Sequence, residues 1–218
     1  MKFKIKKLLL TPKNIKELMK SQFAKPQGKA GEFFTLAMNV INFKLYNAVY
    51  NFVPKDEGAK ILDVGFGNGD MLKRLSEKLD AVLYGIDISE DMRTASTKAN
   101  AKAIAEERMF LKTAAVEDIP FEDGFFDTVY TINTVYFWQD PHKALDEVAR
   151  VLKDGGRFIC AFYSRDYFER KKSFMSENET YYSPKELKEL VRGHGFENAK
   201  VKVVNAKKFA YCLVGEKS

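Results

Sequence analysis

Cysteine and histidine are scarce in this sequence, which holds two of each among its 218 residues. Cys160 and Cys212 lie far apart in apolar stretches, so we expect two buried free thiols, as is usual in a reducing compartment. With His142 and His194 as the sole imidazoles and no Cys-x-x-Cys pair, the residues predict no metal site. No apolar run approaches the roughly 18–20 residues that cross a bilayer, which predicts no membrane span.

Excess positive charge is absent outside the first thirty residues. Lysine and arginine number 36 against 30 acidic residues, a formal net charge of +6. Residues 1–30 hold nine lysines and one acidic residue, Glu17, and so carry +8, which leaves −2 for the rest. This segment indicates either an anionic partner, such as an acidic substrate, nucleic acid or a lipid surface, or a solubilising tail. Its apolar part ends at Thr11-Pro12, too soon for a secretory leader, and we expect a cytoplasmic protein.

The chain has the length of one domain with an appendage. Apolar residues recur at helical spacing before residue 57, and alternating strand and helix patterns begin at residue 60. We therefore divide the chain into a helical cap or lid over 1–57 and a domain over 58–218. The alternation predicts a doubly wound α/β fold, with a mostly parallel seven-stranded sheet and helices on both faces.

The expected elements follow from these patterns. Strands are expected at 60–64, 82–86, 109–113, 126–132 and 157–162, and helices at 70–78, 89–105, 141–152 and 184–193. Two further strands, 200–204 and 209–214, are joined by four residues. So short a link predicts an antiparallel hairpin, because a parallel crossover needs a dozen residues or more.

A glycine-rich loop follows the first strand of the α/β pattern. Gly65, Gly67 and Gly69 stand at alternate positions between that strand and a helix. Glycines there let the backbone approach a ligand at the carboxyl edge of the sheet. A nicotinamide dinucleotide fingerprint would need its third glycine at position 70, which is Asp70. The loop therefore favours another adenosyl ligand over NAD.

An acidic residue ends the second strand. Asp87 lies 22 positions after Gly65, the separation expected when the first two strands are neighbours. A carboxylate at this place can accept hydrogen bonds from both ribose hydroxyls of a nucleoside. Its neighbour Ser89 also suits a helix N-cap, so a purely structural role for the acid is the alternative.

Four motifs of this sequence, in this order along the chain, resemble the motifs of one enzyme family. Ile61–Gly69 resembles the first motif of the class I S-adenosylmethionine-dependent methyltransferases of the small-molecule type, and Asp87 resembles their ribose-binding acid. The stretch 115–129 is similar to their adenine loop and fourth strand, and 146–158 to the helix and turn before the fifth. The match covers about residues 60–163 and implies S-adenosylmethionine as cofactor.

The resemblance also implies roles for single residues. Asp63 would hold the methionine ammonium, and Asn133 the methionine amine or the methyl region. Val116 and Glu117 would edge the adenine ring. Further cofactor-binding residues on this reading are Gly65, Phe66 and Gly67 for the methionine portion, Asp87 for the ribose, and Ile88 and Met92 for the adenine faces. The family often has Asp where this chain has Ala115.

Methyl transfer from a sulfonium is an in-line displacement, so catalysis can consist largely of positioning the acceptor. A base is needed only where the acceptor must lose a proton, and Tyr136 or Tyr163 would then be the candidates. The acceptor site is expected between the cap and an acceptor-side insertion over 164–182. Its candidate residues are Tyr46, Tyr50, Tyr167 and Tyr181.

Four functions remain open at this point. A methyltransferase acting on an anionic or aromatic small molecule rests on the four motifs. The basic N-terminus would suit a nucleic-acid methyltransferase, whose binding would depend steeply on salt. A nicotinamide dehydrogenase is disfavoured by Asp70. A binding-only protein with the same fold would share the cofactor pocket, since fold does not fix function.

Overall fold

The computed structural model describes residues 42–170 and 179–218. The strands are β1 (Lys60–Val64), β2 (Val82–Asp87), β3 (Met109–Thr113), β4 (Phe126–Ile132), β5 (Leu152–Tyr163), β6 (Phe196–Asn205) and β7 (Ala210–Lys217). The helices are α3 (Asp70–Ser76), α4 (Glu90–Ala99), α5 (Ala101–Ala105), α6 (Pro141–Val151), α7 (Arg165–Arg170) and α8 (Pro184–Arg192), preceded by an unlabelled helix over 42–52. Short 3₁₀ turns stand at η1 (Val135–Phe137) and η3 (Ala206–Lys208).

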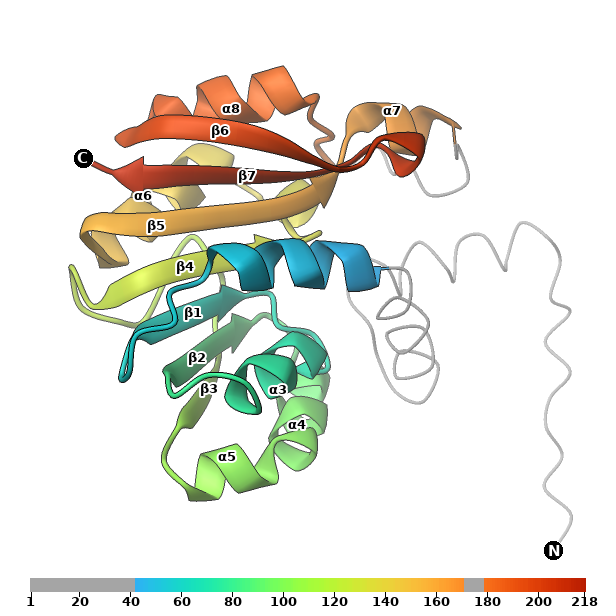
Figure 1. Cartoon of the computed structure of the whole chain (residues 1–218). Coiled ribbons are helices and arrows are strands. Elements are labelled where there is room, and N and C mark those ends of the chain that lie inside the picture. Colours follow the sequence, from blue (N-terminus) through green and yellow to red (C-terminus); the bar gives the residue numbers. More distant parts are fainter. Residues whose placement is uncertain (1–41, 171–178) are drawn as a thin grey trace, which may run out of the picture.

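All seven strands form one sheet in the order β3-β2-β1-β4-β5-β7-β6. β1 to β5 pair in parallel, whereas β7 is antiparallel to both β5 and β6. Figure 1 shows the helix over 42–52 and α3 on the face toward the viewer and α6 behind the sheet. The mostly parallel sheet and the antiparallel hairpin predicted from the sequence are confirmed.

The core lies between the sheet and these helices. β1 is buried from Ile61 to Val64 because both of its faces are covered, as is usual for a central parallel strand. Leu45, Val49 and Val53, spaced along the helix over 42–52 and its end, are buried against the sheet. Arg157 of β5 donates to the carbonyl of Phe52 over 2.7 Å and so holds the end of this helix.

Several predicted boundaries are wrong, for local reasons. The helix expected over 89–105 is broken into α4 and α5 at Asn100, whose side chain donates to the carbonyls of Ser96 (3.0 Å) and Gly69 (3.3 Å). Such side-chain bonds compete with the helical ladder. β5 begins at Leu152, five residues earlier than expected, because Leu152 already pairs with Phe126 of β4. The short helix α7 was not predicted.

A loop rather than a helix joins β3 to β4. Arg150 of α6 donates to the carbonyls of Ile119 (2.9 Å) and Phe121 (2.8 Å), and Glu147 accepts from the backbone N–H of Ile119 (2.8 Å). Phe121 also joins a cluster of rings with Tyr84, Phe125 and Phe126, with centroids 5.0–5.8 Å apart. These contacts fix the loop firmly against the sheet.

Part of the predicted organisation lies outside the described residues. This holds for most of the cap over 1–57, including the basic segment 1–30, and for 171–178 within the insertion over 164–182. The division of the chain at residues 57 and 58 therefore stays a prediction. Cys160 and Cys212 are buried free thiols, as predicted. In the part of the chain that the structure describes, no helix is both long and apolar enough to cross a bilayer.

Candidate functional site

The glycine loop after β1 has a backbone that other residues would adopt only with strain. Gly65, Gly67 and Gly69 have φ of 78°, 56° and 77°, in the left-handed region that favours glycine. A Cβ at Gly65 would overlap the methyl group of Thr134, and one at Gly69 would overlap Ser96. The loop therefore depends on glycine both for its turn and for its close approach to neighbouring elements.

Asp87, at the end of β2, holds this loop in place. Its Oδ2 accepts a hydrogen bond from the N–H of Gly67 (2.8 Å), and its Oδ1 accepts one from the N–H of Ser89 (2.9 Å). Each carboxylate oxygen can accept more than one bond, so both can also serve a ligand. Ser89 caps α4 by accepting from the N–H of Met92 (3.4 Å). Ser89 is therefore the cap of α4, and the carboxylate of Asp87 is not needed for that role.

A cavity of about 450 Å³ opens at the carboxyl ends of β1, β2 and β4. This is where open α/β sheets bind ligands, and the volume suits a small organic molecule. Its lining combines the glycine loop, the ends of the three strands, the helix over 42–52 and the start of α6. The lining residues are Asn42, Tyr46, Asp63–Asn68, Met71, Ile86–Ser89, Ala114–Glu117, Ile132–Thr134, Phe137–Asp140 and Lys143.

The structure brings most of the predicted cofactor residues to this cavity. Those that line it are Asp63, Gly65, Phe66, Gly67, Asp87, Ile88, Val116, Glu117 and Asn133. Met92 is buried but does not line the cavity. Oε1 of Glu117 accepts from the N–H groups of Gln139 (2.8 Å) and Asp140 (3.3 Å). That oxygen therefore joins the β3–β4 loop to the start of α6.

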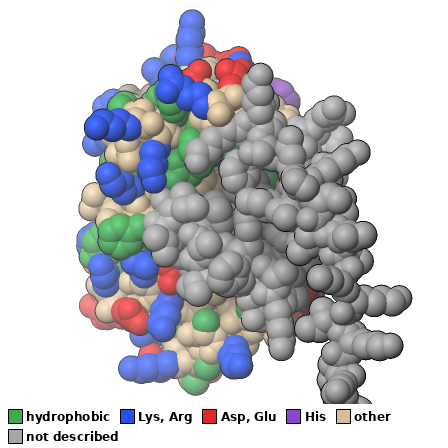
Figure 2. Space-filling model, turned by 90° about the vertical axis from the view of Figure 1, so that its right-hand side faces the viewer, with side chains coloured by type: hydrophobic (Ala, Val, Ile, Leu, Met, Phe, Trp, Pro, Cys, Tyr) green, Lys and Arg blue, Asp and Glu red, His purple; other side chains and the backbone are tan. Residues whose placement is uncertain are grey.

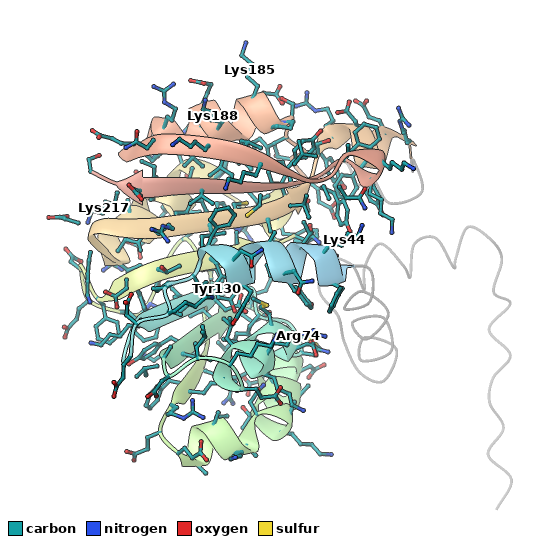
Figure 3. All side chains as sticks on the ribbon, viewed as in Figure 1. Lys44, Arg74, Tyr130, Lys185, Lys188 and Lys217 are labelled. Atoms are coloured by element: carbon teal, nitrogen blue, oxygen red, sulfur yellow. The ribbon has the colours of Figure 1, made fainter. Side chains whose placement is uncertain are left out.

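Asp63 is a buried carboxylate on the wall of the cavity, with 3% of its surface exposed. Desolvation by burial raises its pKa to about 8, a hydrogen bond from the hydroxyl of Tyr130 (2.7 Å) opposes this, and the nearby Asp87 adds to it. Figure 3 shows Tyr130 in the sheet beneath the helix over 42–52. A cation bound beside Asp63 would stabilise its charged form.

We expect Asp63 to lower the stability of the ligand-free protein as the pH rises from about 4 to 8. The folded protein keeps this proton up to a pKa of about 8, whereas the unfolded chain releases it near the usual aspartate value of about 4. Protonation therefore favours folding in this range. Denaturant unfolding at a series of pH values should show a decrease that Asp63→Asn removes and that exposed Asp56→Asn retains. Equal pH dependence in all three proteins would contradict the assignment.

Two asparagines on the cavity wall were not predicted as a pair. Nδ2 of Asn133 donates to Oδ1 of Asn42 over 2.9 Å, and both residues are 7% exposed. Oδ1 of Asn133 lies 3.2 Å from the hydroxyl of Tyr136. Asn133 has φ of 59°, a left-handed backbone that asparagine tolerates better than most residues. Asn42 comes from the helix over 42–52, so this bond joins that helix to the end of β4.

The predicted tyrosines divide between the cavity and the core. Tyr46 lines the cavity, whereas Tyr50, Tyr136, Tyr163, Tyr167 and Tyr181 do not. The hydroxyl of Tyr136 lies 2.9 Å from the carbonyl of Tyr163 and accepts from the N–H of that residue over 2.6 Å. Burial raises the pKa of Tyr136 well above its usual value and that of Tyr163 to about 12. Both hydroxyls are therefore poorly suited to accept a proton near neutral pH.

The chain matches one protein-family model and is similar to the following two proteins of known sequence and one solved structure. Residues 62–160 match a family described as a methyltransferase domain. An uncharacterised protein of Methanocaldococcus jannaschii is 34% identical over 161 residues, 70% of this chain and 70% of that protein. The 27-O-demethylrifamycin SV methyltransferase of Amycolatopsis mediterranei is 29% identical over 114 residues, 52% of this chain and 42% of that enzyme. A chain in a solved complex of the Haloferax volcanii Trm112 methyltransferase activator aligns with a TM-score of 0.74 and 22% identity, over 83% of this chain and 92% of that one.

Proposed function

We propose a small-molecule acceptor for this chain, which belongs to the class I S-adenosylmethionine-dependent methyltransferases. It is a methyltransferase, and S-adenosylmethionine is its cofactor. The cofactor, when bound, supplies a methyl group that its sulfonium already activates. The chain therefore has to hold the cofactor, exclude water and place an acceptor in line with that methyl group.

The residues of the cavity fit this cofactor. The glycine loop lines the cavity with backbone and packs closely against Thr134 at Gly65, and Asp87 offers two acceptor oxygens for ribose hydroxyls. We assign Asp63 to the ammonium of the methionine part, because its buried carboxylate has no cationic partner among the described residues. Val116 and the backbone near Glu117 would edge the adenine, in line with the family resemblance.

The shape of the cavity is the observation that carries the proposal of a small acceptor. The helix over 42–52 contributes Asn42 and Tyr46 to the lining, and Phe137 and Trp138 contribute to it beyond β4. A concave site of about 450 Å³ with aromatic side chains in its lining suits a small molecule. A nucleic-acid acceptor is the alternative. It is favoured by lysine and arginine side chains that gather toward the left of Figure 2, on the face that bears the helix over 42–52.

A labelling experiment tests this proposal. The protein is incubated with S-adenosylmethionine that carries a deuterated methyl group, once with a cell extract freed of macromolecules and once with total RNA and fragmented DNA. We expect labelled small molecules by mass spectrometry and none with the Asp87→Ala variant. Label found in RNA or DNA alone, with a yield that falls steeply as salt is added, would overturn the small-molecule acceptor in favour of nucleic acid.

A further inference from the structure

The paired amides of Asn42 and Asn133 offer unused hydrogen-bonding capacity to the cavity. In this pair Asn133 donates and Asn42 accepts, over 2.9 Å. Nδ2 of Asn42 then keeps two N–H groups, and Oδ1 of Asn133 keeps a lone pair beside the one that faces Tyr136. Because both residues are nearly buried, these groups would stay unsatisfied unless a ligand or water met them. The pair suits a neutral polar group that both donates and accepts.

No imidazole or thiol reaches this cavity. The chain has two histidines, and both are committed elsewhere: Nδ1 of His142 lies 2.9 Å from Nε2 of His194, whose Nδ1 lies 2.6 Å from Asp146. Cys160 and Cys212, the two cysteines of the sequence, are fully buried in β5 and β7. Histidine and cysteine, the side chains that most readily take a proton near neutral pH, are thus absent from the cavity wall.

The carboxylates that line the cavity are engaged in other bonds. Asp87 and Glu117 accept backbone N–H groups, as described above. Asp140 caps α6 by accepting from the N–H groups of His142 (3.0 Å) and Lys143 (3.1 Å). Asp63 has a raised pKa only while no cation stands beside it, and the ammonium assigned to it would lower that pKa again. Among the residues that the structure describes, an acceptor that needs a protein base, such as an alcohol, therefore finds no free one at the cavity.

The charge of the wall also selects among acceptors. Among the described residues, Asp87, Glu117 and Asp140 line the cavity beside the buried Asp63, together with one ammonium, that of Lys143. This lining repels an anionic acceptor. It suits a product that carries positive charge, which the rings of the wall can also stabilise. Those rings belong to Tyr46, Phe66, Phe137 and Trp138.

We propose that the acceptor atom is an amine nitrogen beside the paired amides of Asn42 and Asn133, where it donates an N–H to Oδ1 of Asn133 and reacts through its own free lone pair without a base from the described residues. The amine reacts in its neutral form, after its ammonium has released a proton to solvent. The lone pair then forms the new N–C bond while the C–S bond breaks and its electron pair stays on sulfur. The positive charge passes from sulfur to nitrogen, and the product ammonium releases a proton to solvent where it carries one. This inference rests on the proposed small-molecule acceptor and narrows it to one chemical class.

The target atom is the first test. Fragmentation of the labelled products from the extract experiment should place the deuterated methyl group on nitrogen. With a purified amine product as guide, its parent amine and the matching alcohol are then titrated by calorimetry into protein saturated with S-adenosylhomocysteine. We expect the amine to bind at least tenfold more tightly. Label on oxygen, sulfur or carbon would overturn the amine while leaving a small-molecule methyltransferase intact, and label only in nucleic acid would overturn both.

The amide pair is tested by Asn42→Ala, with Asn47→Ala as the matched control, because Asn47 is exposed on the same helix and does not line the cavity. We expect Asn42→Ala to weaken amine binding about tenfold, the effect of one or two lost hydrogen bonds, and to leave S-adenosylhomocysteine affinity within about twofold. Asn133→Gly, which suits the left-handed backbone, should also weaken the amine. Equal amine affinity in Asn42→Ala, Asn47→Ala and the unmodified protein would overturn the assignment.

Discussion

Replacing Asp87 with alanine is expected to lower the affinity for S-adenosylhomocysteine by at least about 100-fold. Two hydrogen bonds from ribose hydroxyls to a carboxylate would be lost, each contributing about 1.5–3 kcal/mol. The same change releases the N–H of Gly67, which Asp87 now accepts over 2.8 Å, so the glycine loop also loses its support. Calorimetric titration of the purified variant measures the effect directly.

A second acidic residue provides the control. Asp154 lies near the start of β5 with 89% of its side chain exposed, and it does not line the cavity. Asp154→Ala should therefore bind S-adenosylhomocysteine like the unmodified protein. Titration with NADH distinguishes a site for S-adenosyl ligands from a site for nicotinamide dinucleotides. We expect no saturable binding of NADH to either variant. Unchanged affinity in Asp87→Ala would refute the ribose assignment.

Gly65→Ala is expected to destabilise the protein by about 2–4 kcal/mol and to abolish cofactor binding. Alanine at φ of 78° costs about 1 kcal/mol in backbone strain, and its Cβ would overlap the methyl group of Thr134. In a chain of this size, each kcal/mol lowers the melting temperature by roughly 2–4 °C. Thermal unfolding with and without S-adenosylhomocysteine gives both effects.

Two further variants separate strain from collision. Gly124 has φ of 61° and open space around its Cβ position, so Gly124→Ala should show the strain alone, about 1 kcal/mol. Combining Gly65→Ala with Thr134→Ser removes the methyl group that is in the way and should restore part of the lost stability. If the Gly124→Ala and Gly65→Ala variants have the same melting temperature, the overlap with Thr134 does not contribute to the loss of stability.

The fold, and the gathering of most of the proposed cofactor residues at one cavity, could be predicted because their signals are local. Apolar strands alternate with helical patterns, and three glycines follow the first strand within five positions. The spacing from Gly65 to Asp87 placed the acid beside the loop because parallel neighbours bring their carboxyl ends to one edge of the sheet. One helix cap was also visible, since Ser89 precedes a helix and accepts the N–H of Met92.

The pairing of Asn42 with Asn133 could not be predicted in the same way, although Tyr46 and Asn133 were each predicted as site residues and line the cavity. Asn42 and Asn133 are 91 positions apart, and neither follows a motif that marks the other. Their contact depends on how the helix over 42–52 packs against the sheet, which no local pattern specifies. Tyr136 stood at a plausible distance from β4 for a base, yet its ring packs against Phe168 and Tyr181 in the core. Polarity alone does not distinguish a buried tyrosine hydroxyl from one that faces a ligand.

The helix over 42–52 serves two purposes that are usually kept on separate elements. Its apolar side fills the core with Leu45 and Val49, while its first turns bring Asn42 and Tyr46 to the cavity. A change at either of these two positions therefore also affects a helix that packs in the core. In evolution or engineering, changes at Asn42 or Tyr46 would have to preserve the packing beneath them, so specificity in this chain should drift slowly and in step with its stability.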